Sequence, residues 1–131
     1  MTKRIPSDNR ILAKHAAAIR RLGKRVVADV IEIGRLLTEC KRICGHGNWL
    51  PWLDREFGWT DDTALNFSRV YELSKSRNFR DLSLPLSGLY LLAAPSTPQE
   101  ARDEIIERAQ AGETIPVAEA KRIIEHAKEQ Q

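Results

Sequence analysis

One row of apolar and near-apolar residues, repeating in steps of three and four, runs through the first third of the chain. That period places the residues on one stripe of an α-helix, so it predicts a single amphipathic helix over residues 7–44. The members of the row are Leu12, His15, Ile19, Leu22, Val26, Val30, Ile33, Leu37, Cys40 and Cys44. Ser7 or Asp8 can cap the start of this helix, and the Gly-His-Gly sequence at 45–47 stops it.

A helix of this length is unusual in a chain of 131 residues, which is the size of one domain with one core. Such a helix either spans its domain or packs against a second copy as a coiled-coil-like seam. We favour partial packing within the chain and keep a homodimer through this helix as an open alternative. Val27 and Ile31 lie off the row and indicate a second apolar contact in the middle of the helix. Gly23 and Gly34 permit a bend or the close approach of another helix.

The opposite side of the same helix is basic. It carries Arg10, Lys14, Arg21, Lys24, Arg35 and Arg42, with Arg25 on its flank. The whole chain has a net charge of only +3, but residues 1–44 hold eleven Lys or Arg and four Asp or Glu, whereas residues 81–131 hold five and nine. This polarity can orient a protein on a polyanion by its basic end. The alternative is that these charges only solvate the surface of a long helix.

Residues 48–76 have the pattern of a helix-turn-helix. Asn48 can cap a first helix, which ends at the glycine of the sequence Phe-Gly-Trp. Thr60 can cap a second helix, and Asp61 and Asp62 in its first turn suit the positive end of the helix dipole. The apolar residues Trp49, Trp52, Leu53 and Phe57 of the first helix are expected to pack, with Trp59 at the corner.

Three more helices are predicted within residues 84–128. The first is a short apolar core helix in the sequence LPLSGLYLLAA, and the others cover about 99–111 and about 117–128. Thr97 and Glu100 resemble a capping arrangement before the helix at 99–111. No alternation of period two predicts a strand in the sequence. The chain is therefore predicted to be a single all-α domain over 1–131 with about six helices.

A helix-turn-helix commonly binds DNA with its second helix in the major groove. The outward polar residues of the predicted second helix are Thr63, Asn66 and Arg69, which can contact a thymine methyl, an adenine edge, and guanine or phosphate. The candidates for phosphate contacts are Lys75 and Arg77, which follow, and Arg20, Arg21, Lys24 and Arg25 of the first helix. Double-stranded DNA is thus the expected partner. The alternative is a purely structural helical hairpin, because Asp61 and Asp62 would repel phosphates at the leading end.

No motif in the sequence predicts catalysis. A glycine-rich phosphate loop, a nucleophile elbow and a zinc-protease motif are missing, so we expect no enzyme, no catalytic residue and no cofactor. Cys40, Cys44 and His46 offer at most three ligands where a structural zinc site needs four. Both cysteines are therefore interpreted as small core residues, and no metal is expected. The apolar runs are too short to span a membrane and a secretory signal is missing, so we expect a cytoplasmic protein.

Two motifs resemble known proteins. They are Leu89-Tyr90-Leu91-Leu92-Ala93-Ala94-Pro95 and Ala111-Gly112-Glu113-Thr114-Ile115-Pro116-Val117-Ala118-Glu119-Ala120-Lys121. With the preceding helix-turn-helix, residues 53–128 resemble the central DNA-binding region of ParB/KorB-type partition and regulatory proteins. The sequences GHGNWLPWL, FGWT and LYLLAAPSTP are more closely similar to a family of uncharacterised proteins from phages, plasmids and integrative elements, over residues 33–125. The arginine-rich nucleotide-binding motif of ParB proteins is missing, so a CTP switch is not implied.

This resemblance implies a ParB-like helical bundle that binds DNA and serves transcription regulation or another accessory role on a mobile genetic element. The first hypothesis is therefore a DNA-binding accessory or regulatory protein, anchored on phosphates by its basic helix. The second is a non-catalytic adaptor that binds a protein partner through the long amphipathic helix, because such a helix can serve as a partner-binding seam.

Overall fold

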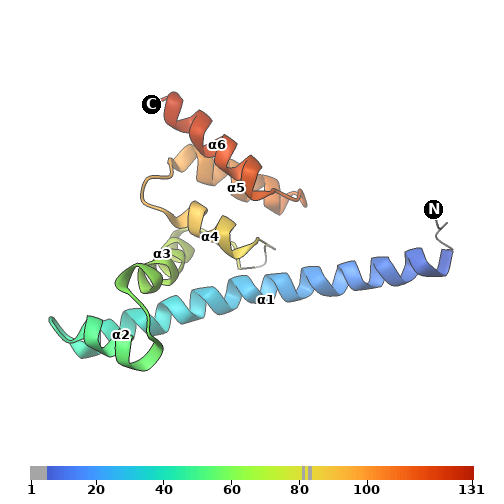
Figure 1. The fold of residues 1–131 in the computed structure, drawn as a ribbon. Coiled ribbons are helices and arrows are strands. Elements are labelled where there is room, and N and C mark those ends of the chain that lie inside the picture. The colour runs from blue at the N-terminus through green and yellow to red at the C-terminus, as the bar shows by residue number, and fades with distance from the viewer. Residues whose placement is uncertain (1–5, 81, 83) are drawn as a thin grey trace.

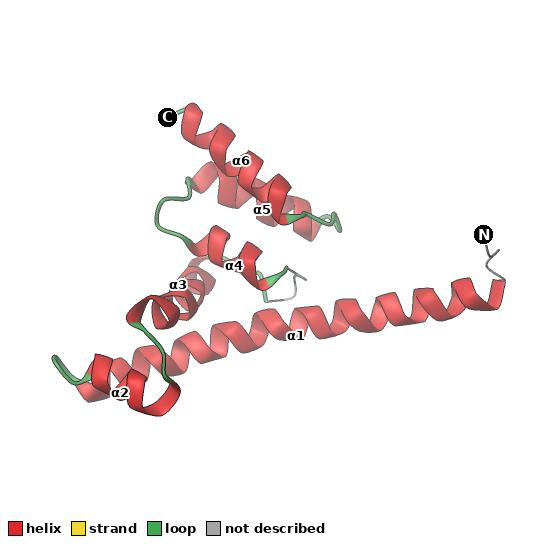
Figure 2. Ribbon diagram, viewed as in Figure 1, coloured by secondary structure: helices red, strands yellow, loops and turns green. Residues whose placement is uncertain are grey.

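A computed structural model describes residues 6–80, 82 and 84–131 of the chain. Its elements are α1 (Pro6–Cys44), α2 (Trp49–Phe57), α3 (Asp61–Ser76), α4 (Leu86–Ala93), α5 (Gln99–Gln110) and α6 (Val117–Glu129). The described residues form helices and connecting loops, without a strand among them (Figure 2). The prediction of an all-α fold with about six helices is confirmed, and the predicted helix ends differ from the observed ones by one or two residues.

Helix α1 is 39 residues long, and the other five helices gather over its C-terminal half (Figure 1). Its N-terminal half extends beyond them. We call residues 9–26 of α1 the arm. The predicted partial packing of this helix is confirmed: the apolar row is uncovered along the arm, where Leu12, Ile19, Leu22 and Val26 are exposed. The row becomes buried only from Val30 onward, because no other helix lies over its earlier part.

The main core forms where α3 and α4 cross α1. Val27 and Ile31 are fully buried there and Val30 of the apolar row joins them, so α1 faces the core with the side that these three residues share. The second apolar contact that was predicted for Val27 and Ile31 is therefore the main contact between α1 and the core. The remaining core comes from α3 to α6 and their connections, with Val70, Phe79, Leu82, Leu84, Leu89, Leu92, Ala101, Ile105, Ile106, Ile115, Ala120, Ile123 and Ile124.

Gly34 sets the distance between α1 and α3. A Cβ atom at this position would lie 2.2 Å from the carbonyl oxygen of Phe67 and 2.7 Å from the Cβ of Tyr71. Only a glycine leaves room for the backbone of α3 to approach so closely. The close helix approach predicted for Gly34 is confirmed.

A second apolar cluster lies at the C-terminal end of α1, where α2 covers the apolar row. Its buried members are Leu37, Trp49, Leu53 and Ala64, and Cys40 and Cys44 pack against it half-buried. An uninterrupted series of aromatic contacts then leads from α2 to α4. The rings are those of Trp49, Trp52, Phe57, Trp59, Phe67 and Tyr90, with neighbouring centroids 4.6–6.1 Å apart. Such pairs stabilise beyond their buried area and hold the turn between α2 and α3 against the core.

The C-terminal end of α4 is closed by side chains from the following segment. Thr97 is buried and donates its hydroxyl hydrogen to the carbonyl of Leu91 over 2.6 Å. Arg102 donates to the carbonyls of Leu92 and Ala94 over 2.7 and 2.8 Å. The predicted cap of α5 by Thr97 is wrong, since Pro98 holds the N-cap position without a side-chain bond and Thr97 serves α4 instead.

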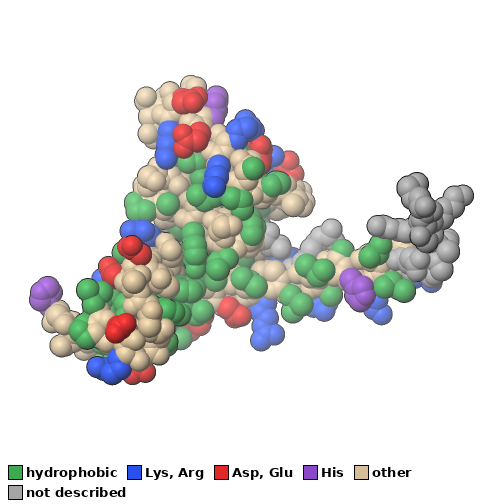
Figure 3. All heavy atoms as spheres, in the orientation of Figure 1, with side chains coloured by type: hydrophobic (Ala, Val, Ile, Leu, Met, Phe, Trp, Pro, Cys, Tyr) green, Lys and Arg blue, Asp and Glu red, His purple; other side chains and the backbone are tan. Residues whose placement is uncertain are grey.

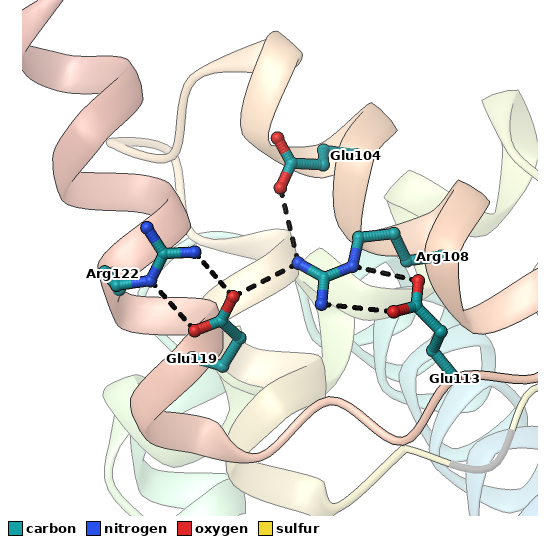
Figure 4. Close-up of polar contacts among 5 residues, drawn as sticks. All are labelled: Glu104, Arg108, Glu113, Glu119 and Arg122. Carbon is teal, nitrogen blue, oxygen red and sulfur yellow. Dashed lines mark hydrogen bonds and ion pairs between the residues drawn. The ribbon is translucent and has the colours of Figure 1, made fainter.

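Helices α5 and α6 are joined by a cluster of charged side chains (Figure 4). Arg108 of α5 lies at its centre and contacts Glu113 of the connecting turn at 3.0 Å and Glu119 of α6 at 3.2 Å. Glu119 also accepts from Arg122 over 2.6 Å. These bonds from Arg122 and Arg108 lower the pKa of Glu119 to about 2. The cluster therefore fixes the α5–α6 hairpin with a carboxylate that stays charged well into acid.

Candidate nucleic-acid interface

Helices α2 and α3 form a helix-turn-helix in shape, joined by residues 58–60. Gly58 has a φ of 68°, its backbone N–H donates to the carbonyl of Asp54, and that of Trp59 donates to the carbonyl of Leu53, which ends α2. Across the turn, the indole Nε1–H of Trp49 donates to Oδ1 of Asp61 over 3.2 Å. The first turn of α3 is thereby tied to the start of α2.

The predicted side-chain caps of both helices are wrong. Asn48 and Thr60 occupy the two N-cap positions, but neither side chain bonds to the following backbone N–H groups. The Asn48 amide instead donates to the carbonyl of Cys44 over 3.1 Å, at the end of α1. The Thr60 hydroxyl lies 3.4 Å from that of Thr63. The turn geometry therefore depends on Gly58 and on the Trp49–Asp61 bond.

Helix α3 is less open than a freely exposed recognition helix. Thr63, Asn66 and Arg69 were expected to point outward, but all three are half-buried. The reason is that α3 packs against α1 on one side and α4 on another. Asp62 and Glu72 remain exposed on this helix, so its accessible face carries negative charge at its leading end.

Leu65 lies between the candidate base-contact residues in the sequence of α3 and is half-buried. It lines a small hollow of about 180 Å³ together with Thr38 and Lys41 of α1 and Ser68 of α3.

The two basic residues near the end of α3 have partners within the chain. Arg77 is half-buried and forms an ion pair with Asp103 of α5, which joins α3 to α5. Lys75 is exposed, contacts Glu72 at 3.2 Å and lies 4.8 Å from the centre of the Tyr71 ring. The hydrogen bond with Glu72 raises the pKa of the lysine. Lys75 remains accessible to a phosphate, whereas a phosphate contact by Arg77 would compete with a structural bond.

The cations of the arm have a different environment. The basic residues whose side chains are described there are all exposed, namely Arg10, Lys14, Arg21, Lys24 and Arg25. The side chain of Arg20 lies outside the described ones. Among the described side chains, no carboxylate lies within ion-pair distance of these five cations. Lys and Arg side chains project from the lower edge of α1 in Figure 3.

Two cations in the C-terminal half of α1, Arg35 and Arg42, are paired with carboxylates of the same helix. Arg35 donates to Glu32 over 3.0 and 3.1 Å, and Arg42 pairs with Glu39, in both cases three residues apart. The hydrogen bond with Arg35 holds the pKa of Glu32 below its usual value. The unpaired cations of the predicted basic face lie along the arm, and beyond it Lys41 is exposed without a carboxylate partner among the described side chains.

A groove of about 860 Å³ lies between the arm and the turn that joins α5 to α6. Arg21 and Lys24 line it from the arm, and Asn78, Gln110 and Thr114 line it from the opposite side. Its apolar floor includes Ala17, Phe79, Leu82 and Ala109. Two of the exposed cations thus border a largely apolar hollow that is open to solvent and that Glu113 also lines.

The described part of the chain was also compared with the requirements of a metal site and of a membrane span. It contains no group of three or more His, Cys, Asp or Glu side chains that could hold a metal ion. Cys40 and Cys44 are free thiols that pack against the second cluster, as the interpretation of them as small core residues requires. Within the same residues, no helix is long and apolar enough to cross a membrane.

The fold and the site define an all-helical protein with a helix-turn-helix-shaped pair and a basic helical arm. The chain belongs to a family described as "Protein of unknown function (DUF3102)", which it matches over residues 8–126. Neither the comparison with curated proteins nor that with solved structures finds a match.

Proposed function

We propose that this protein is a non-catalytic DNA-binding protein that anchors on phosphates through its arm. The observation that carries the proposal is the set of exposed arm cations without a carboxylate partner among the described side chains, in contrast to Arg35 and Arg42 on the same helix. Cations that are already paired gain less from a phosphate, whereas unpaired ones release the counterions of DNA on binding. The resemblance to phage, plasmid and integrative-element proteins supports an accessory or regulatory role on a mobile genetic element.

In this mechanism the arm supplies most of the affinity for DNA, and α3 makes the contacts with base edges. Thr63, Asn66 and Arg69 are half-buried but remain the polar residues of α3 that are suited to base edges. Asp62 opposes the approach of phosphates at the leading end of the same helix. The expected behaviour is therefore salt-sensitive binding with a modest sequence preference.

The test is a titration of long duplex DNA, by mobility shift or fluorescence anisotropy, at several salt concentrations. The chain should bind at about 50 mM salt, and the logarithm of its affinity should fall linearly with the logarithm of salt concentration. Replacing Arg21 and Lys24 with Gln should lower the slope of that line by about 2, because two phosphate contacts are lost.

The matched control removes two cations from the same helix where carboxylates already pair them. Arg35→Gln with Arg42→Gln gives the same change in net charge and should alter the slope by less than about 0.5. Equal slopes for the two double variants would mean that net charge, and not contact through the arm, causes the salt dependence. Absence of any binding at about 50 mM salt would overturn the proposal, because even non-specific binders are detected there.

A protein adaptor without DNA binding is the second candidate function. It is favoured by the exposed apolar side chains of the arm, since an amphipathic helix can lay such a face into a partner's groove. A chain that fails to bind DNA at low salt but associates through these residues would support the adaptor.

A further inference from the structure

The arm carries an apolar row that no other described element covers. Leu12, Ile19, Leu22 and Val26 are exposed by 45, 68, 55 and 44%, and Ile11 beside them by 52%. Farther along α1 the same row is covered by a helix, since Leu37 packs against Trp49 and Leu53 of α2. The chain itself thus shows that a helix is a suitable cover for this row.

The spacing of the uncovered part is that of a coiled-coil seam. Leu12, Ile19 and Val26 are seven residues apart, as are His15 and Leu22 between them, which gives the a and d positions of a heptad. The residues that flank the seam include the small Ala16, Ala18 and Gly23, which permit another helix to approach closely. The basic residues other than Arg25 lie on the opposite face of the helix.

We propose that the arms of two copies of this chain pair as an antiparallel coiled coil. The row can pack against a second copy of itself, because each copy supplies large a and d side chains and small flanking residues with the same heptad period. Antiparallel packing follows from the position of α2. A parallel pair would lead both seams into the segment where α2 already covers the row, whereas an antiparallel pair uses only residues 11–26 of each chain.

This arrangement also suits the shape and the charges of the molecule. The five other helices of each copy lie at opposite ends of an antiparallel pair, so they do not collide (Figure 1). The dipoles of the two arms then oppose each other. The basic faces point outward on both sides of the seam. The pairing needs no DNA, so its test is independent of the proposed function.

The dimer is expected to be weak. Sixteen residues of helix extend about 24 Å, and the buried area falls below the roughly 800 Å² per partner of a standard stable interface. The cations of two neighbouring arms also repel each other, and added salt screens that repulsion. Pairing should therefore strengthen with salt, which is the opposite of the dependence expected for DNA binding.

An anionic membrane surface is the other cover that a basic amphipathic helix can take. Helices of that kind usually insert aromatic anchors, and the segment 9–26 contains neither Trp nor Phe. We therefore assign the row to a second copy, and vesicle binding becomes an outcome of the test.

The first experiment is sedimentation velocity of the whole chain from about 1 µM to about 500 µM, at low and high salt. Ile19→Ser with Leu22→Ser should weaken the dimer by about 100-fold. Ile43→Ser with Leu50→Ser is the matched control, because these two side chains are exposed by 68 and 56% but lie outside the arm. The control should dimerise as the unaltered chain does. A strict monomer at every concentration, or equal loss in both variants, would overturn the proposal.

The second experiment tests the direction of pairing, in a chain whose two native cysteines are replaced by serine and whose helicity is checked by circular dichroism. Leu12→Cys and Leu22→Cys chains are mixed with a bis-maleimide that spans about 10 Å. Cross-links should join the two kinds of chain, because the antiparallel pair sets a against d positions and identical positions then lie about 15 Å apart along the helix axis. Cross-links between identical chains would show parallel packing. A monomer that binds vesicles of anionic lipid through the arm would assign the row to a membrane.

Discussion

Trp49 donates its indole N–H to the carboxylate of Asp61 over 3.2 Å, across the turn between α2 and α3. The ring of Trp49 is buried in the second cluster, whereas Asp61 lies in the first turn of α3. One bond thus joins the packing of α2 to the start of the helix that is the candidate for base contacts. It gives Asp61 a structural role that its neighbour Asp62 lacks.

Replacing Asp61 with Ala should therefore destabilise the fold more than replacing Asp62 with Ala. Both changes remove a negative charge from the first turn of α3, which costs about 0.5 kcal/mol each through the helix dipole. Only the first also leaves a half-buried indole N–H without its partner, which costs a further 1–2 kcal/mol, roughly. Urea unfolding of both variants measures the difference. Equal losses would mean that the bond contributes nothing.

Gly34→Ala should open the crossing of α1 and α3. A methyl group at this position would lie 2.2 Å from the backbone oxygen of Phe67, so the helices must separate. Overpacking of this kind costs about 2 kcal/mol or more, which exceeds the gain of about 1 kcal/mol that alanine brings to a helix.

Gly88→Ala in α4 is the control for this change. Its added Cβ atom would meet only the ring of Pro85, at 3.3 and 3.5 Å, so the gain in helix propensity should remain largely visible. Thermal unfolding should show a clear loss for Gly34→Ala and little change for Gly88→Ala. A neutral Gly34→Ala would contradict the close approach of the two helices.

Acid should weaken the α5–α6 hairpin in a defined pH window. Glu119 has its pKa lowered to about 2 from the usual 4.5 by its bonds with Arg122 and Arg108, so in this range the unfolded chain binds the proton first. The stability that the charged carboxylate contributes is complete above about pH 4.5 and is lost as the pH falls toward 2. Glu119→Gln should therefore flatten the dependence of the unfolding free energy on pH within this window.

The measurement is urea unfolding at a series of pH values between about 2 and 6. Other paired carboxylates, such as Glu32 and Glu39, keep some pH dependence in every variant, so the difference between variants carries the information. Glu125→Gln, also on α6, serves as the control and should follow the unaltered chain. The prediction fails when Glu119→Gln shows the same slope as this control.

Asp62→Asn should strengthen DNA binding when α3 lies near the duplex. The exposed carboxylate precedes Asn66 by one helical turn, and its removal relieves repulsion of phosphates without a large change in shape. The gain should be about threefold to tenfold at low salt and should shrink as salt is added. Asp54→Asn on α2 is the control for net charge. The same gain in both variants would place the DNA away from α3 and leave the arm as the only contact.

The sequence by itself determined the number of helices and their ends, because these depend on neighbouring residues. Gly58 ends α2 through its left-handed backbone, and the step of three and four residues defines α1 without reference to the rest of the chain. Gly34 could also be singled out, because glycine within a helix has few other uses than a bend or a close contact.

Only the tertiary structure decided which faces of these helices are used. Sequence periodicity placed the apolar row on α1 but did not show what covers it, and of that row only Val30 joins Val27 and Ile31 in the main core. The half-burial of Asn66 and the pairing of Arg77 with Asp103 likewise depend on elements far along the chain. The physical reason is that a helix forms through bonds within a few residues, whereas burial and ion pairing require partners that folding brings together.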